Sequence, residues 1–369
     1  MKKDSKKSVI VFGCGQMGSI VASSMKDLGY NVTVVDSTKK AFDNLGSGYE
    51  TKSVMNLRAE APSLILGKDV VISCLPYHKN YAVARSAIEL SVPYCDLGGR
   101  VDVSESIKDL AKKSGFPYVF TDLGLAPGLV NILAEHGCAK VEDPTDVKMM
   151  VGGLPSRRVD NPLGYLTTWS IDGLINEYKD DCLILKNGKV ETVRGMDGIE
   201  DVNTVKSVNH DKLEAFYTSG GAAHSIERMQ ELGVQNCSYK TLRFKGHGKL
   251  VKFLIRDCEL DDETMKQIFT RGCSIFKCND GFSFSSRIRD VVILVCVVRN
   301  NSGIQWRREV FVAGGDEATA MQKATGYSIV SAAHLMVNER IAPTSTHLRY
   351  SDVPFEEFSS IIKSLGIEI

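Results

Sequence analysis

The stretch SVIVFGCGQMG, residues 8–18, decides the fold of the first part of the chain. An apolar strand runs into three glycines, Gly13, Gly15 and Gly18, and an amphipathic helix is predicted to open at Gln16. Strand, turn and helix in this order are the context that a dinucleotide-binding turn requires. The first glycine permits the tight turn, the second admits a pyrophosphate, and the third lets helix and strand pack closely. We therefore expect a nicotinamide dinucleotide here, contacted by the three glycines, Gln16 and Met17.

Asp36 ends the next predicted strand, residues 31–35, and lies 18 residues beyond the last glycine of the turn. A carboxylate at this place can accept hydrogen bonds from the ribose hydroxyls and would repel a 2′-phosphate. We therefore expect NAD rather than NADP, with Ser37 beside the ribose. Lys39 and Lys40 follow closely and could accommodate a phosphate, so NADP stays open as the alternative.

Strands and helices alternate through the first 125 residues. Further strands are expected at 51–54, 69–73, 92–95 and 118–121, with helical segments between them. This alternation predicts a parallel sheet with right-handed crossovers. Ligands bind beyond the carboxyl ends of such strands. The loops at those ends supply the other expected cofactor contacts, which are Leu75, Pro76, Leu97, Gly124 and Pro127.

After about residue 150 the alternation of strands and helices gives way to short β-type runs. Asn187-Gly188 predicts a hairpin between two of them. We expect an antiparallel sheet with a few helices, an α+β domain. Residues 317–340 and 355–365 are predicted to be helical and to return to the first domain. The fold class is thus α/β: a Rossmann-type parallel-sheet domain, 1–127 and 318–369, with an inserted α+β domain, 128–317.

Composition excludes several classes of protein. The 45 basic and 45 acidic residues cancel, which argues against a nucleic-acid binder and against acidic disorder. The longest apolar run, 291–298, has eight residues, too few for a membrane span. The apolar stretch 9–12 is too short for a signal peptide, so a cytoplasmic location is expected. The 10 cysteines contain no CxxC pair and no zinc spacing, so no metal is expected.

Five segments together resemble one enzyme family in order and spacing. They are DLGLAPGLVNIL (122–133), VGGLP (151–155), TTWSIDGLINEYKDDCLILKNGK (167–189), LEAFYTSGG (213–221) and YKTLRFKGH (239–247). The pattern resembles the lysine 6-dehydrogenases of the saccharopine dehydrogenase-like superfamily. The resemblance implies a Rossmann domain and an α+β domain that forms subunit contacts, hence a homodimer or higher homo-oligomer. It also implies oxidative deamination of the ε-amine of L-lysine with NAD, giving an aldehyde that cyclises.

Two other functions stay open at this point. One is a saccharopine-type dehydrogenase or reductase, whose secondary amine is joined to a dicarboxylate and so demands more basic residues. Arg100, Arg157 and Arg158 are available for this purpose. The other is a non-catalytic sensor of dinucleotides, because a fold does not fix a function.

The expected reaction needs a carboxylate clamp and a base for the reacting amine. Arg243, Lys245 and His247 alternate along a predicted strand, so all three are expected on one face. Arg243 can bind a substrate carboxylate at two points, and His247 can serve as the base. Lys245 fits a surface charge better. Asp122, at a strand end, can bind an ammonium group or help to remove its proton.

Two aromatic residues complete the expected site. Tyr77 directly follows Leu75-Pro76 and is expected to cap the nicotinamide face or to touch the substrate. Trp169 is expected to line the substrate pocket, with a core position as its alternative. Ser170 is predicted to cap the helix that follows.

Overall fold

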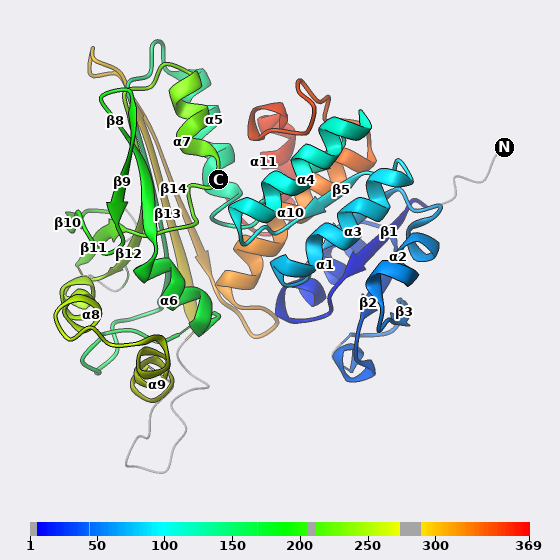
Figure 1. Ribbon diagram of the computed structural model, residues 1–369, viewed down its shortest axis with the longest axis horizontal. Helices are drawn as coiled ribbons and strands as arrows, with labels where there is room; N and C mark the ends of the chain where they lie inside the picture. Colours follow the sequence, from blue (N-terminus) through cyan, green and yellow to red (C-terminus); the bar gives the residue numbers. More distant parts are fainter. Residues whose placement is uncertain (1–5, 44, 168, 205–207, 209–211, 274–288) are drawn as a thin grey trace. The chain divides into compact units, whose positions relative to one another are not determined.

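The computed structural model describes residues 6–43, 45–167, 169–204, 208, 212–273 and 289–369 (Figure 1). The chain divides into two compact units. Unit 1 comprises 1–132 and 322–368, and unit 2 comprises 133–321 and Ile369. In the part of the chain that the structure describes, no helix is both long and apolar enough to cross a membrane.

Unit 1 is built on a six-stranded parallel sheet, as the sequence predicts. The strands are β1 (Ser8–Phe12), β2 (Asn31–Asp36), β3 (Glu50–Ser53), β4 (Val70–Ser73), β5 (Tyr94–Asp96) and β6 (Val119–Phe120). Their order is β3-β2-β1-β4-β5-β6, and every neighbouring pair is parallel. The strands after β1 are added on one side of it and those from β4 onward on the other, so the strand order reverses between β1 and β4. In such sheets ligands bind in the crevice at this point.

Helices cover both faces of this sheet. The helices of unit 1 are α1 (Gln16–Asp27), α2 (Leu57–Ile65), α3 (Tyr77–Glu89), α4 (Val101–Ser114) and α11 (Phe355–Ser364). Helices α5 (Leu129–Lys140) and α10 (Ala320–Val337) each cross the unit boundary in the sequence. Helices α2, α3 and α4 pack on the strand face that carries Ile10 and Phe12. Helix α10 packs on α1, because a Cβ at Gly326 would lie 2.8 Å from Ile20. The C-terminal helices thus return to the first domain, as predicted.

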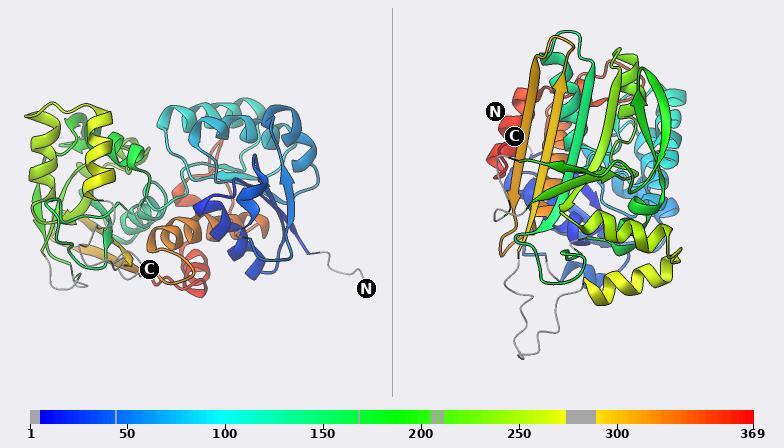
Figure 2. Two further views of the ribbon diagram at one scale, coloured as in Figure 1. Left: turned by 90° about the horizontal axis from the view of Figure 1, so that it is seen from below. Right: turned by 90° about the vertical axis from the view of Figure 1, so that its left-hand side faces the viewer.

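Unit 2 holds an eight-stranded sheet. The strands are β7 (Asp146–Pro155), β8 (Asp181–Lys186), β9 (Lys189–Arg194), β10 (Glu200–Val202), β11 (Leu213–Tyr217), β12 (Asn236–Phe244), β13 (Asp290–Arg299) and β14 (Gln305–Ala313). The order is β10-β11-β12-β7-β13-β14, and β8 pairs with β12 and β9 (Figure 2). The hairpin at Asn187-Gly188 is confirmed, with positive φ at both residues.

The expectation of an antiparallel sheet is wrong for one pair of strands. Strands β12 and β7 run parallel, with Asn236 opposite Asp146, so the sheet is mixed. The alternation of apolar residues reveals a strand but not its partner. The long connection between β7 and β12, which carries α6 (Ile171–Lys179) and α7 (Ser225–Glu231), allows the chain to re-enter the sheet in the same direction.

Two helices that follow β12 help to close the interior of unit 2. Helices α8 (His247–Arg256) and α9 (Asp262–Gly272) pack with α6 around Tyr178, Phe216 and Phe269. Seven of the nine described cysteines are buried. Burial of this kind is what the apolar settings of the cysteines predict.

Candidate functional site

The glycine turn of unit 1 has the backbone that dinucleotide binding requires. Gly13 has a φ of +94°, and a Cβ there would lie 2.9 Å from the carbonyl oxygen of Cys74. A Cβ at Gly18 would lie 1.8 Å from the carbonyl oxygen of Gly13, so helix and turn touch. A Cβ at Gly15 would meet nothing within 4 Å. Open space above Gly15, at the first turn of α1, fits an incoming pyrophosphate.

Asp36 lies beside this turn at the end of β2. Its Oδ2 accepts a hydrogen bond from the Cys14 nitrogen at 2.8 Å, and its Oδ1 accepts one from the Thr38 nitrogen at 3.1 Å. The hydroxyl of Ser37 lies 3.4 Å from Oδ1. The backbone therefore holds the carboxylate at the mouth of the glycine turn, where an adenosine ribose lies in such folds. The residues present fit a nicotinamide dinucleotide.

The strand-end loops of unit 1 pack on one another around the turn. Leu75 follows β4, and its Cδ2 lies 3.3 Å from a Cβ placed at Gly13. Pro76 is the N-cap of α3. The carbonyl oxygen of Leu97 lies 3.6 Å from a Cβ at Gly124, and that of Pro127 lies 3.0 Å from it. Leu75 and Pro76 thus lie in the loop beside the glycine turn, and Leu97, Gly124 and Pro127 lie in the two contacting loops after β5 and β6.

Tyr77 and Gln16 occupy helix starts at this edge. Tyr77 is the first residue of α3, is 39% exposed, and lies 5.8 Å from the guanidinium of Arg100, measured to the ring centroid. Its Cβ lies 3.1 Å from a Cβ placed at Gly99. Gln16 opens α1, and its carbonyl oxygen accepts a hydrogen bond from the side chain of Gln322 in α10. Met17 follows it in the first turn of α1. These are solvent-facing starts, as contact with a ligand requires.

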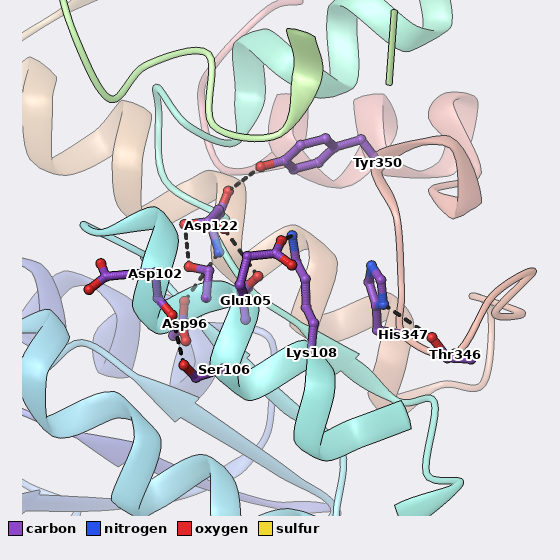
Figure 3. Close-up of polar contacts among 11 residues, drawn as sticks. Asp96, Asp102, Glu105, Ser106, Lys108, Asp122, Thr346, His347 and Tyr350 are labelled. Atoms are coloured by element: carbon purple, nitrogen blue, oxygen red, sulfur yellow. Dashed lines mark hydrogen bonds and ion pairs between the residues drawn. The ribbon is translucent and has the colours of Figure 1, made fainter. Parts of the chain in front are cut away.

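Asp96 is a buried carboxylate at the end of β5, in the region drawn in Figure 3. Its Oδ1 accepts from the Gly98 nitrogen at 2.8 Å and the Asp122 nitrogen at 3.1 Å, and its Oδ2 accepts from the Tyr94 hydroxyl at 2.8 Å. Burial and the neighbouring Asp122 raise the pKa of Asp96 to about 7. Asp96 therefore ties the loop after β5 to the loop after β6. The sequence analysis did not single it out.

Asp122 occupies a different environment from the one expected of a base. It is 3% exposed, has a φ of +64°, and accepts from the hydroxyls of Ser104 at 2.9 Å and Thr121 at 3.1 Å. Its carbonyl oxygen accepts from the Tyr350 hydroxyl at 2.9 Å (Figure 3). Because its carboxylate is buried and already accepts hydroxyl hydrogens, we assign Asp122 to the positioning of the loops. Its expected role in removing a substrate proton gains no support from this geometry.

The prediction that Arg243, Lys245 and His247 alternate along one strand is wrong. Strand β12 ends at Phe244, and His247 is the first residue of α8. Gly246, with a φ of +99°, makes the turn between them. Lys245 is exposed and pairs with Asp201, whereas Arg243 and His247 are buried. A turn at glycine was the signal that the strand could not continue.

His247 is enclosed in a chain of hydrogen bonds. Its Nδ1 lies 3.0 Å from the carbonyl oxygen of Leu163, which can only accept, so Nδ1 carries the proton. Its Nε2 then accepts from the Tyr178 hydroxyl at 3.0 Å, and that oxygen accepts from Nε of Arg243 at 2.7 Å. Burial and the charge of Arg243 lower the pKa of His247 to about 3. His247 is therefore neutral and enclosed beside Arg243, and this environment gives no support to its expected role as the base.

Arg243 itself is held rigidly but keeps donor capacity. Its Nη1 donates to the carbonyl oxygen of Leu242 at 2.8 Å, and its guanidinium lies 4.7 Å from the ring centroid of Tyr165. Among the residues that the structure describes, Nη2 has no hydrogen-bond acceptor. A buried guanidinium with an unused N–H edge is suited to binding a carboxylate. The geometry fits the clamp expected of Arg243.

Glu177 is a functional candidate that the sequence analysis missed. Glu177 lies in α6, near the buried side of the helix. Leu174, three residues before it, and Tyr178, directly after it, are both buried. A carboxylate near the apolar side of an amphipathic helix is a signal that could have identified it. Burial raises the pKa of Glu177, while the Arg243 guanidinium and two threonine hydroxyls oppose the rise. The charged pair Glu177 and Arg243 therefore belongs to unit 2.

Trp169 lies at the start of α6 and is half-buried against the interior of unit 2. A Cβ at Gly173 would lie 2.6 Å from its ring. The predicted N-cap is confirmed, because the Ser170 side chain accepts from the Gly173 nitrogen at 3.3 Å. This packing agrees with the core position that was the alternative for Trp169. Among the described residues, no group of three His, Cys, Asp or Glu side chains could hold a metal ion.

Comparisons with known proteins cover both units. Residues 9–115 match the family model described as the saccharopine dehydrogenase NADP binding domain, and 124–350 match the saccharopine dehydrogenase C-terminal domain. The chain is 26% identical over 272 residues to alpha-aminoadipic semialdehyde synthase of Mus musculus, covering 69% of this chain and 29% of that protein. It is 28% identical over 268 residues to saccharopine dehydrogenase [NADP(+), L-glutamate-forming] of Pyricularia oryzae, covering 70% and 59%.

A solved structure shares the fold over the full length. Apo saccharopine dehydrogenase (L-Glu forming) from Saccharomyces cerevisiae superposes with a TM-score of 0.73 at 18% sequence identity, covering 98% of each chain. The curated relatives are longer proteins: this chain spans 29% of the mouse protein and 59% of the fungal one.

Proposed function

Because the chain belongs to the saccharopine dehydrogenase family, we propose that it is a nicotinamide-dinucleotide-dependent oxidoreductase of a carbon–nitrogen bond. The bond proposed is the one between the ε-carbon of an L-lysine moiety and its nitrogen. The glycine turn at Gly13, Gly15 and Gly18 carries this proposal, because its open face fits a pyrophosphate. Arg243, with an unused N–H edge, supports an amino-acid substrate.

The reaction proposed has a simple balance. The ε-carbon gives a hydride to the dinucleotide as the lone pair of the nitrogen forms a C=N bond. Water then adds to this carbon, the amine leaves, and an aldehyde remains. The dinucleotide supplies the hydride acceptor when bound. The protein binds and orients: the glycine turn would hold the pyrophosphate, and Arg243, fixed by Tyr178 and His247, would hold the α-carboxylate.

Two substrates share this chemistry and differ only in the group on the nitrogen. Saccharopine carries a glutamate-derived group there, and the names of the relatives favour it. Free L-lysine carries hydrogen only, and the stretch TTWSIDGLINEYKDDCLILKNGK favours it by its resemblance to lysine 6-dehydrogenases. Saccharopine brings an additional pair of carboxylates. In unit 2 the described Lys240 and Lys245 already pair with Glu200 and Asp201, so those two cations favour the less acidic substrate.

For the dinucleotide we propose NAD. The matched domain model and the fungal relative carry NADP in their descriptions. This chain has Asp36 at the ribose end of β2, held by the Cys14 and Thr38 nitrogens, and a 2′-phosphate there would meet a like charge. Lys39 and Lys40 are the groups that would favour NADP instead.

The experiment is a screen of L-lysine, saccharopine, ornithine and diamines with NAD and with NADP, followed by the absorbance of the reduced dinucleotide. The proposal expects reduction with L-lysine or saccharopine, and faster reduction with NAD. If neither NAD nor NADP is reduced with L-lysine, and neither is reduced with saccharopine, the proposal is contradicted. Binding of NAD, measured by titration calorimetry, separates a failure of the dinucleotide site from a wrong substrate.

A further inference from the structure

Two opposite charges lie close together on one face of β12, in unit 2. Residues two apart on a strand share a face, so Thr241 and Arg243 lie on the same side of the sheet, about 7 Å apart. Glu177 of α6 reaches that side, because its Oε1 accepts from the Thr241 hydroxyl at 2.6 Å. The carboxylate of Glu177 and the guanidinium of Arg243 are thus electrostatic neighbours, and each affects the pKa of the other.

The carboxylate of Glu177 is fixed on one oxygen only. Its Oε1 also accepts from the Thr218 hydroxyl at 3.1 Å, and the hydroxyls of Thr218 and Thr241 lie 2.7 Å apart. Among the residues that the structure describes, Oε2 accepts no hydrogen bond. Glu177 is also half-buried rather than enclosed. One oxygen therefore holds the group in place, and the other remains available as an acceptor.

Arg243 presents the complementary half of the same arrangement. Its Nε and Nη1 are used by Tyr178 and by the carbonyl oxygen of Leu242, which leaves Nη2 as a donor. Tyr165 and Tyr178 flank the guanidinium with their rings, at 4.7 and 5.6 Å from its carbon to the ring centroids. A rigid donor and a rigid acceptor of opposite charge match the two charged groups on the α-carbon of an amino acid.

We propose that Glu177 binds the α-ammonium of the substrate while Arg243 binds its α-carboxylate, so that the chain selects L-α-amino acids. This inference rests on the proposed function, because it assumes that unit 2 binds the amino-acid half of the substrate. It names the class that is accepted, a zwitterionic head group with a distal amine. It also names the classes that are rejected: ω-amino acids without an α-amine, and diamines without a carboxylate.

A structural role for Glu177 makes a different prediction. If Glu177 only held Thr218 and Thr241 in place, its loss would weaken every ligand of unit 2 to the same extent. If it binds the α-ammonium, its loss weakens only those ligands that have one. The comparison of a ligand with its desamino analogue therefore distinguishes the two roles without relying on the size of either effect alone.

The experiment is titration calorimetry of the full chain saturated with NADH, which prevents turnover of the amine. The ligands are L-lysine, saccharopine, 6-aminohexanoate, which is lysine without its α-amine, and 1,5-diaminopentane, which is lysine without its carboxylate. Wild type, Glu177→Gln and Glu191→Gln are compared. Glu191 is an exposed glutamate of β9 and serves as the matched control.

Wild type is expected to bind L-lysine or saccharopine at least 10-fold more tightly than 6-aminohexanoate. Glu177→Gln is expected to weaken the α-amino acid about 10- to 100-fold, the range for a hydrogen bond between charged groups, and to change 6-aminohexanoate by less than 2-fold. Glu191→Gln should change neither. The comparison of ligands in wild type keeps the test decisive if Glu177→Gln does not fold.

Two outcomes overturn the inference: equal weakening of both ligands by Glu177→Gln, or no preference of wild type for the α-amino acid. A failure of the proposed reaction looks different. In that case no reduced dinucleotide forms from any amine, while the discrimination between L-lysine and 6-aminohexanoate persists.

Discussion

Replacing Asp96 by asparagine is expected to stabilise the protein above neutral pH. Asp96 is 1% exposed, and burial together with the charge of Asp122 raises its pKa to about 7. An aspartate in the unfolded chain has a pKa near 3.9. The folded state therefore keeps a proton that the unfolded state releases, and stability must fall as the pH rises from about 4 to about 7. Asparagine has no proton to release, so this loss disappears in Asp96→Asn.

The hydrogen bonds around Asp96 allow the substitution. Its Oδ1, which accepts from the Gly98 and Asp122 nitrogens, is retained in asparagine. The amide NH₂ that replaces Oδ2 can donate to the Tyr94 oxygen, and the Tyr94 hydroxyl can turn to the carbonyl oxygen of Asn80, at 3.5 Å. Lys108 lies nearby. Burial lowers its pKa, and the negative charge of Asp122 offsets part of this lowering.

The size of the effect follows from the two pKa values. The difference is worth about 4 kcal/mol in total, of which about 3 kcal/mol develops between pH 5 and pH 8. Urea unfolding followed by circular dichroism at pH 5, 6.5 and 8 measures it. Asp109→Asn, at an exposed position of α4, is the control and should stay within about 0.5 kcal/mol of wild type. The reasoning is refuted if the difference in unfolding free energy between Asp96→Asn and wild type is the same at all three pH values.

Four further predictions concern binding and rate. Asp36→Ala should narrow the preference for NAD over NADP in steady-state kinetics, because the carboxylate beside the ribose is lost; a faster wild-type rate with NADP would contradict this role. Arg243→Ala should weaken amino-acid binding about 10- to 100-fold in calorimetry and leave NAD binding near normal, and an unchanged Michaelis constant for every amino acid would exclude the clamp. The rate with L-lysine at saturating substrates should rise from pH 7 towards pH 10, because only about 0.04% of an amine with a pKa near 10.4 is neutral at pH 7. His247→Asn should lower this rate without changing the shape of the profile, since burial holds the pKa of His247 near 3 and leaves it neutral throughout; an altered alkaline limb would restore His247 as a base.

The sequence predicts unit 1 well, because its signals are local. Three glycines at fixed spacing and short apolar runs define strands and turns without knowledge of distant contacts, and the parallel order of β1, β2 and β4 follows from the crossovers. The same kind of signal locates the hairpin at Asn187-Gly188 and the Ser170 cap.

What the sequence misses depends on contacts between distant residues. The parallel pairing of β12 with β7 joins segments about 90 positions apart, which no local period reveals. The neutral state of His247 comes from burial and from the charge of Arg243, and the distant carbonyl oxygen of Leu163 determines which ring nitrogen carries the proton. The sequence around His247 indicates neither its burial nor its contact with Leu163. The Glu177 carboxylate is a candidate binding group only because Thr241 and Arg243, on strand β12, lie beside it. The sequence can therefore identify candidate residues, whereas their protonation states and contacts require the structure.

Transfer of deuterium from the ε-carbon tests the central claim most directly. The protein is incubated with NAD and either L-lysine or saccharopine deuterated at the ε-carbon of the lysine moiety, and the reduced dinucleotide is analysed by mass spectrometry. The account predicts one deuterium in each reduced dinucleotide, together with an aldehyde product of the lysine moiety. Reduced dinucleotide without deuterium, or no reduction with either substrate, would contradict oxidation at that carbon.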